Sequence, residues 1–206
     1  MARYIQLYSF IPLQKENKMS IEIATAVQKP LVILLADTSQ VMKQSYPGTN
    51  FTCTRKEILE RALPLLTRQI DFIRIITFAG GKTEEYGETP LQKMQWRGEP
   101  FILPALQCVQ QFNDKTYGYI QSPLKPKILF VILTSGIISD SSYASQWFLT
   151  AETNMFFSVH VMGTNLTLWQ NIATRNHQVN LEIGSPNPDV LVSHILKNVQ
   201  RFSKNN

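Results

Sequence analysis

Two short polar turns hold the residues best placed to do chemistry. Residues 37–40 (DTSQ) follow a run of apolar residues, 31–36, and residues 134–136 (TSG) follow a second, largely apolar segment, 127–133. Short apolar runs of this kind are typical of strands that are buried on both faces of a parallel sheet. Ligands of such sheets meet the carboxyl ends of the strands, so both turns are expected at a binding edge. The carboxylate of Asp37 can bind a ligand there, or it can shape the turn by accepting backbone N–H groups.

A serine at the end of a strand can also act as a nucleophile, and Ser135 is the candidate here. It would need a histidine base, and the chain contains three, His160, His177 and His194. His160 lies within an apolar strand pattern, and the other two are expected to face solvent or to serve the structure. Neither cysteine, Cys53 or Cys108, has a recognisable base beside it, and the chain lacks the Gly-x-Ser-x-Gly elbow and the glycine-rich phosphate loops. We therefore expect no enzyme, with a Rossmann-like hydrolase as a minor alternative.

The composition is that of an ordinary soluble protein. Of the 206 residues, 44% are hydrophobic and 17% are charged, which suits one folded domain. No apolar run approaches the ~18 residues that a membrane span needs, and the first residues lack the pattern of a secretory signal. With two cysteines and no signal, we expect free thiols and a cytoplasmic location. The net charge of +5 is spread along the chain without a basic block, so nucleic-acid binding by a basic face is only a lesser alternative.

Strand-like and helix-like segments alternate along the chain. Strands are predicted at 30–36, 72–78, 127–133, 156–162 and 179–183, and helices at 100–112, 143–153, 166–174 and 188–202. A further helix is expected to begin after Thr54, because Thr54 and Glu57 have the spacing of a capping box, and Pro64 should kink or shorten it. Asn187 and Pro188 suit the first positions of the last helix.

This alternation predicts an α/β fold with a doubly wound, mostly parallel sheet and helices on both faces, in three layers. The predicted globular domain covers residues 29–206. An additional edge strand is expected near residues 91–96, and residues 1–28 are interpreted as an N-terminal arm or an edge hairpin.

Four segments, in this order and spacing, resemble a known family. They are LVILLADTSQVM at 31–42, RIITFAG at 74–80, KILFVILTSG at 127–136 and FFSVHVMGTN at 156–165. From about Lys29 to Arg201 the chain resembles a von Willebrand factor A (vWA) domain. From Lys127 onward, with Trp147 after the TSG turn, it is most similar to the bacterial tellurite-resistance-type (TerY-like) branch. The resemblance implies a non-catalytic binding module.

Many vWA domains hold Mg²⁺ in a metal-ion-dependent adhesion site, and the resemblance implies which residues would form it here. Asp37 and Ser39 match the first two positions of its Asp-x-Ser-x-Ser loop, whereas Val41 replaces the second serine. Residues 98–102 of the second loop contain no threonine, and Ser135 replaces the aspartate of the third loop. Because Mg²⁺ needs several oxygen ligands in near-octahedral geometry, a degenerate site is expected, with a working Mg²⁺ site as the alternative.

The loops at the carboxyl edge, 37–53, 96–101 and 134–142, are therefore predicted to bind a protein partner. Polar contacts are expected from Thr38, Gln40, Glu99 and Asp140. Glu99 lies in the second loop and Asp140 in the third, so either carboxylate could also reach a metal bound there. Apolar contacts are expected from Tyr46, Phe51 and Trp96, acting as exposed aromatic anchors. The likeness to the TerY-like branch implies a bacterial cytoplasmic system with kinase or phosphatase partners, but the sequence does not identify one.

Overall fold

The computed structural model describes residues 31–47, 53–86, 94–121 and 124–204. Within these ranges, six strands form one sheet with the order β3-β2-β1-β4-β5-β6. Five of the strands are parallel: β1 (Leu31–Asp37), β2 (Phe72–Ala79), β4 (Ile128–Thr134), β5 (Met155–Val161) and β6 (Val179–Ile183). The sixth, β3 (Lys82–Tyr86), runs antiparallel to β2 at the edge of the sheet. The predicted doubly wound α/β architecture is confirmed.

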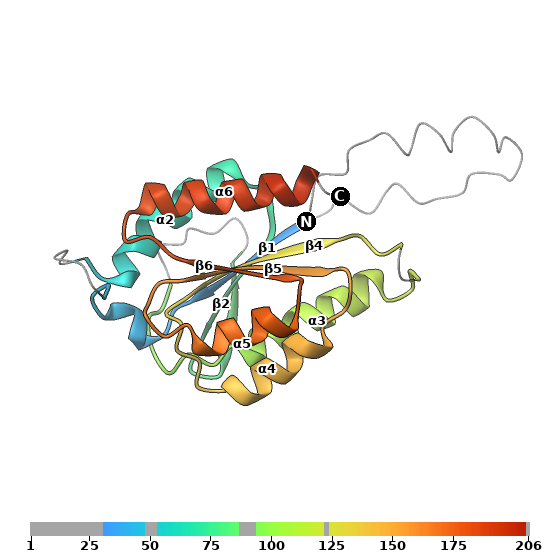
Figure 1. Cartoon of the computed structure of the whole chain (residues 1–206), viewed down its shortest axis with the longest axis horizontal. Coiled ribbons are helices and arrows are strands. Elements are labelled where there is room, and N and C mark those ends of the chain that lie inside the picture. The colour runs from blue at the N-terminus through green and yellow to red at the C-terminus, as the bar shows by residue number, and fades with distance from the viewer. Residues whose placement is uncertain (1–30, 48–52, 87–93, 122–123, 205–206) are drawn as a thin grey trace, which may run out of the picture.

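Helices cover both faces of the sheet, giving three layers (Figure 1). One face carries α2 (Arg55–Gln69) and α6 (Pro188–Lys204), whose apolar residues share a core with the sheet. The other face carries α3 (Leu103–Tyr117), α4 (Ser141–Thr150) and α5 (Thr167–Arg175), which share a second core. A short 3₁₀ helix, η2 (Gln40–Lys43), follows β1.

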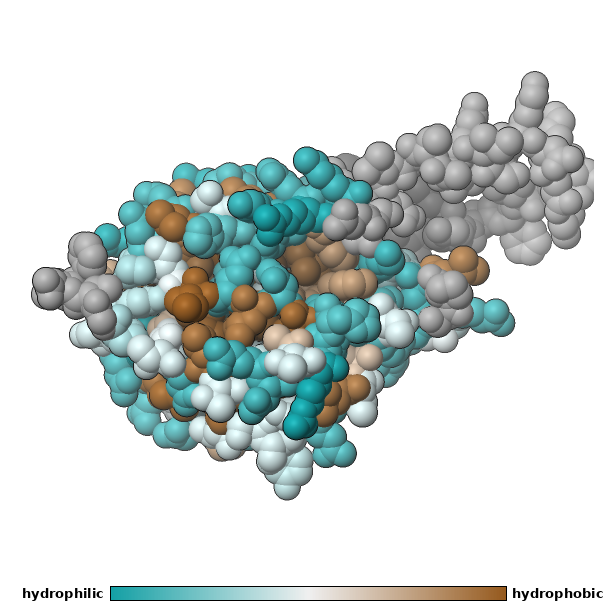
Figure 2. Space-filling view, in the orientation of Figure 1, coloured by the Kyte–Doolittle hydropathy of each residue, from teal (hydrophilic) through white to brown (hydrophobic). Residues whose placement is uncertain are grey.

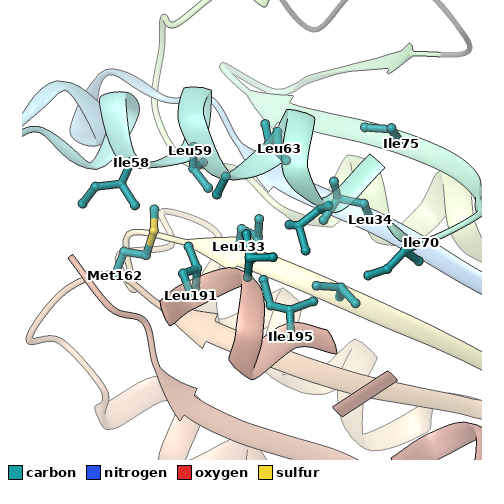
Figure 3. Packing of buried hydrophobic residues seen from close by; sticks show 14 of the residues in the cluster. Leu34, Ile58, Leu59, Leu63, Ile70, Ile75, Leu133, Met162, Leu191 and Ile195 are labelled. Atoms are coloured by element: carbon teal, nitrogen blue, oxygen red, sulfur yellow. The ribbon is translucent and has the colours of Figure 1, made fainter. Parts of the chain in front are cut away.

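The two central strands explain why the sheet is covered on both faces. In β1, Val32 and Leu34 belong to the core under α2 and α6, whereas Ile33 and Leu35 belong to the core under α3, α4 and α5. Figure 3 shows the first of these cores, with leucine and isoleucine side chains from α2 and α6 meeting those of the sheet. Each such side chain stabilises the fold by about 1.5–3 kcal/mol when it is fully buried.

Two predicted helix starts are confirmed at the level of single hydrogen bonds. The Oγ1 atom of Thr54 accepts the N–H of Glu57 at 3.2 Å, and the Oε2 atom of Glu57 accepts the N–H of Thr54 at 2.7 Å. This reciprocal capping box opens α2. At the start of α6, Asn187 Oδ1 accepts the N–H of Asp189 at 2.9 Å, and Pro188 occupies the first helical position.

Other predicted boundaries are wrong. The edge strand is β3, directly after β2, because Gly80 and Gly81 adopt positive φ angles of 57° and 71° and turn the chain at once. Residues 94–96 form no strand, and 91–93 lie outside the described residues. Pro64 does not shorten α2, which continues to Gln69; Pro64 is exposed, so water can hydrate the carbonyl group that it leaves unpaired.

The remaining differences are small. Helix α3 extends five residues past the predicted end at 112, to Tyr117, and α4 spans Ser141–Thr150 rather than 143–153. The predicted loop 37–53 contains η2 and a bridge between Ser45 and Thr54. The predicted arm or hairpin at 1–28 lies outside the described residues.

The surface is mixed in character. Figure 2 shows apolar areas between the two helical layers, interleaved with polar residues. Among the residues described, every helix is too short or too polar to cross a lipid bilayer.

Candidate functional site

The candidate site lies where the winding of the sheet changes direction. Strands β1 and β4 are neighbours at the centre of the sheet, with β2 beyond β1 and β5 beyond β4. Such a switch point separates the loops that leave the carboxyl ends of the two strands and opens a place for a ligand. Asp37 ends β1 and Thr134 ends β4, so the two polar turns found in the sequence meet here.

Asp37 joins these two turns. Its carboxylate has no exposed surface (0%). Oδ1 accepts the N–H of Ser39 at 2.9 Å, and Oδ2 accepts both the N–H of Ser135 at 3.1 Å and its hydroxyl at 2.9 Å. Burial raises the pKa of Asp37, and these hydrogen bonds oppose the rise. The carboxylate therefore makes the backbone contacts expected of a group that shapes the turn.

Ser39 leaves an unpaired polar atom beside this carboxylate. Its side chain is fully buried, and its Oγ atom makes no hydrogen bond of normal geometry with a described residue, although it lies near enough to the Asp37 carboxylate to oppose the rise of the Asp37 pKa. A buried hydroxyl without a partner costs free energy. Its presence next to Asp37 marks the position as one where a ligand oxygen, a water molecule or a cation has a place.

Arg55 is a buried cation that sequence analysis missed. It is the first residue of α2 and is only 7% exposed. Its Nε atom donates to the carbonyl oxygen of Met162, and its Nη1 atom donates to that of Val41 at 3.1 Å. Burial lowers the pKa of Arg55, and the charge of Asp37 opposes this effect, so the two groups are close enough to interact. We call Asp37, Ser39, Ser135 and Arg55 the Asp37 cluster.

The loop after residue 96 packs against the loop that follows β1. The N–H of Gln40 donates to the carbonyl oxygen of Gly98 at 2.9 Å, and the N–H of Arg97 donates to that of Thr38 at 3.0 Å. These backbone hydrogen bonds hold residues 97 and 98 beside residues 38–40. The two loops therefore form one continuous surface at the carboxyl edge.

Side chains connect the third loop to the same surface. Gln40 Nε2 donates to Glu99 Oε1 at 3.1 Å, and the Ser139 hydroxyl donates to Glu99 Oε2 at 3.4 Å. Asp140 has a different task, because its two carboxylate oxygens accept the N–H groups of Ile102 at 3.1 Å and Leu103 at 2.7 Å. Asp140 thus stabilises the start of α3, where a negative charge is favourable.

The expected exposure of two aromatic residues is wrong. Tyr46 and Trp96 are each 8% exposed and belong to the core under α2 and α6. The hydroxyl of Tyr46 donates to the carbonyl oxygen of Gly184, and the ammonium group of Lys56 lies 5.9 Å from the centre of the Trp96 ring. Both side chains lie in loops by sequence, but the loops fold back onto the helices and bury them. Phe51 lies outside the described residues.

The oxygen atoms available to a cation are few. Asp37 supplies the one carboxylate of the Asp37 cluster, and Ser39 and Ser135 supply hydroxyl groups. The carbonyl oxygen of Val41, the residue that replaces the second serine, already accepts a hydrogen bond from Arg55. Over the described ranges, no group of three or more His, Cys, Asp and Glu side chains is arranged to hold a metal ion.

A second buried polar group, the His160 cluster, lies along β5 beneath α6. It consists of Ser158, His160, Glu182 and Asn198. Asn198 Nδ2 lies 2.9 Å from Glu182 Oε1 and 3.0 Å from Ser158 Oγ, and Ser158 Oγ lies 3.0 Å from His160 Nε2. Burial lowers the pKa of His160 to about 4. Ser158 and His160 are two residues apart on one face of a strand, which is the sequence signal that could have indicated the cluster.

Comparisons with known proteins place this geometry in a familiar fold. No family model matches the sequence, and no curated protein matches it. Among solved structures, BatB from Bacteroides thetaiotaomicron is 15% identical with a TM-score of 0.56, covering 85% of this chain and 99% of its own. The vWA domain of SpRpn10 is 14% identical with a TM-score of 0.58, covering 81% of this chain and 93% of its own.

A third similar structure is the manganese-loaded TRAP protein of Plasmodium vivax. It is 17% identical with a TM-score of 0.53, covering 81% of this chain and 72% of its own. At these identities the likeness concerns the fold alone. The chain has the vWA fold, as the four sequence segments predicted.

Proposed function

We propose that the chain is a non-catalytic protein-interaction module that binds its partner through the carboxyl edge of the sheet, with a degenerate metal site. Domains with the vWA fold are generally protein-interaction modules. The single observation that carries the proposal is the Asp37 cluster, in which the one carboxylate already accepts three hydrogen bonds and the charge of a buried arginine is near enough to interact with it.

The charges near Asp37 are unfavourable for a divalent cation. Mg²⁺ gives up its water reluctantly and favours sites with carboxylate ligands, whereas this site offers one carboxylate, which already accepts three hydrogen bonds. The guanidinium group of Arg55 already supplies a positive charge nearby. The Ser39 hydroxyl would suit a metal. A single hydroxyl, however, does not compensate for the shortage of carboxylates and the nearby positive charge of Arg55. The residues therefore do not fit a metal-dependent mode of binding.

The surface around the cluster suits a protein partner. Hydrogen bonds link the loops after β1, after residue 96 and after β4, so the surface is held in one arrangement before binding. A surface that is already ordered loses little conformational entropy when a partner binds. Gln40, Arg97, Glu99 and Ile137 are exposed on these loops and offer polar, charged and apolar contacts.

The narrower predictions concern the branch of the family, the kind of partner and the location in the cell. The likeness to the TerY-like branch, with its kinase or phosphatase partners, and the cytoplasmic location remain predictions that rest on the sequence. The absence of catalysis belongs to the same proposal: the hydroxyl of Ser135, the one candidate nucleophile at this edge, donates to the Asp37 carboxylate at 2.9 Å and makes no hydrogen bond to a histidine of the described chain.

A thermal melt tests the metal part of the proposal. We expect the melting temperature to be the same in EDTA and in millimolar Mg²⁺, Mn²⁺ or Ca²⁺. A working site would stabilise the fold by about 2.7 kcal/mol at a hundredfold excess of metal over its dissociation constant. A shift that Asp37→Ala abolishes would show that the site is active, and the metal-dependent alternative would then replace this proposal.

A binding experiment tests the location of the interface. The immobilised full chain, in EDTA, is used to capture a partner from a lysate of the source organism, and the purified pair is then measured by calorimetry. Glu99→Lys, on the proposed surface, should abolish binding. Gln69→Lys is the matched control, because Gln69 is exposed at the far end of α2. Equal loss in both variants, or loss in neither, would contradict the proposed interface.

A further inference from the structure

A small pocket opens on the carboxyl edge, next to the Asp37 cluster. Its volume is about 180 Å³, and it lies between β2, β3 and the loop that follows residue 96. The residues that give it chemical character are Thr38, Thr77, Lys82, Glu84, Arg97 and Gly98. Thr38 is the neighbour of Asp37 in the chain, so the pocket belongs to the surface that we propose as the interface.

Packed backbone fixes the wall of the pocket. Gly98 has a φ angle of 75°, and a Cβ atom at this position would lie 2.6 Å from the Cα atom of Gly80. Only glycine tolerates both the positive φ and this close approach. The loop after residue 96 is thus held against the β2–β3 turn, and the side chains of Lys82 and Arg97 are carried by the two segments that meet there.

Three donor groups at the pocket have no partner. Lys82 and Arg97 are exposed, and their side chains make no hydrogen bond or ion pair with any described residue. The hydroxyl of Thr38 likewise makes no hydrogen bond with the described residues, and it is open to the pocket that Thr38 lines, since it is not one of the fully buried unpaired atoms. Two cations and a hydroxyl that line one pocket without a partner in the described part of the chain can all donate to a ligand that supplies acceptor oxygens.

The charges of the lining select the class of ligand. Lys82 and Arg97 are cationic and Glu84 is the one acidic side chain of the lining, so the pocket carries a net positive charge that favours an anion. Arginine binds a carboxylate through two parallel hydrogen bonds. The volume of about 180 Å³ suits a short side chain.

We infer that this pocket receives the carboxylate of an Asp or Glu side chain of the protein partner, with Arg97, Lys82 and the Thr38 hydroxyl as its donors. The inference rests on the proposed function and assigns a chemical class to the partner. Recognition of this kind uses the protein's own cations at the carboxyl edge, so it requires no metal ion.

Selection from a displayed random-peptide library on the full chain, in EDTA, tests the inference. We expect the selected peptides to share an acidic residue at one position, and replacing that residue by its amide should weaken binding about two- to fivefold, as should the Lys82→Ala, Arg97→Ala double variant. Binding should weaken further as salt is raised. Arg68→Ala is the control, because Arg68 is exposed near the distal end of α2, and it should leave binding unchanged.

The outcomes separate the two proposals. Peptides that lack a shared acidic residue, yet lose binding in Glu99→Lys, would overturn the carboxylate pocket and leave the proposed interface standing. Peptides that bind the Glu99→Lys chain and the Lys82→Ala, Arg97→Ala chain as tightly as they bind the unaltered chain would overturn both proposals. A phosphoserine peptide that binds more tightly than its glutamate counterpart would overturn the assignment to a carboxylate.

Discussion

The Asp37 cluster lies at the carboxyl edge of the sheet, where three loops meet, whereas the His160 cluster lies along β5, beneath α6. Both are buried, but their hydrogen bonds differ. The Asp37 cluster leaves the Ser39 hydroxyl unpaired and stands next to an open pocket with unpaired donors. In the His160 cluster, Asn198 joins strand to helix with two short hydrogen bonds. Each cluster holds one buried atom without a partner among the described residues, Ser39 Oγ at the edge and His160 Nδ1 inside. Only the Asp37 cluster stands next to an open pocket, and this position at the surface, rather than the unpaired atom alone, indicates a place for a partner.

The hydrogen bonds of the His160 cluster determine its proton positions. Glu182 can only accept, so Asn198 must present its Nδ2 group, which donates to Glu182 and to Ser158. The hydroxyl of Ser158 then donates to His160 Nε2, and the neutral ring carries its proton on Nδ1. That atom lies 3.8 Å from Glu182 Oε2, too far for a normal hydrogen bond.

The largest expected effect is at Arg55. Replacing it by leucine should destabilise the fold by about 3 kcal/mol, because the variant removes the three hydrogen bonds that Arg55 donates to the oxygen atoms of Met162, Val41 and Gln44 and leaves these acceptors unpaired. Urea unfolding measures the loss. Arg68→Leu, an exposed position on the same helix, should change stability by less than about 0.5 kcal/mol. Equal effects at both positions would show that Arg55 does not hold the edge together.

The His160 cluster should make stability depend on pH. Burial lowers the pKa of His160 from 6.5 to about 4. Between these values the unfolded chain binds a proton that the folded chain excludes. The stabilisation is therefore fully present above pH 6.5 and is lost as the pH falls toward 4, by as much as about 3 kcal/mol. Urea unfolding at a series of pH values should show this slope, and His160→Gln should flatten it, whereas His194→Gln should preserve most of it.

The Asp37 cluster should give the opposite slope. Burial raises the pKa of Asp37 above 3.8, so the folded chain holds a proton more tightly than the unfolded chain does. Its contribution is favourable below pH 3.8 and is lost as the pH rises through the folded pKa. The difference between the wild-type and Asp37→Asn stabilities should therefore change with pH in the direction opposite to that of His160. Slopes of equal sign would remove the contrast between the two clusters.

Asn198 should have an intermediate effect. Asn198→Ala leaves Ser158 and Glu182 without their shared donor, which should cost about 1–3 kcal/mol. Lys197→Ala, an exposed neighbour on α6, is the control and should be close to neutral. Because the His160 cluster is assigned to stability, Asn198→Ala should not change the affinity of the folded chain for peptides selected on the carboxyl edge; reduced affinity would contradict that assignment.

Local patterns in the sequence predicted the fold and the location of the site. The apolar runs that became β1 and β4, and the capping box at Thr54, each depend on residues that are close in the chain. The positions of Tyr46 and Trp96 could not be predicted in this way, because their burial depends on α2 and α6. Arg55 did carry a signal: a cation at the start of a helix is unfavourable unless something else compensates it. Its partners are up to 107 positions away.

The smallest expected effects on stability concern the unpaired hydroxyl groups of the edge. Ser39→Ala and Thr38→Val remove hydroxyls that have no partner among the described residues, so both variants should be neutral or slightly more stable in urea, within about 1 kcal/mol. Ser135→Ala, by comparison, removes a hydrogen bond to Asp37 and should cost about 1 kcal/mol. If the hydroxyl of Thr38 serves the partner, Thr38→Val should nevertheless weaken the binding of acidic peptides. Lower stability in both Ser39→Ala and Thr38→Val would mean that these atoms are already paired, and the contrast between an edge kept for binding and an interior kept for stability would fail.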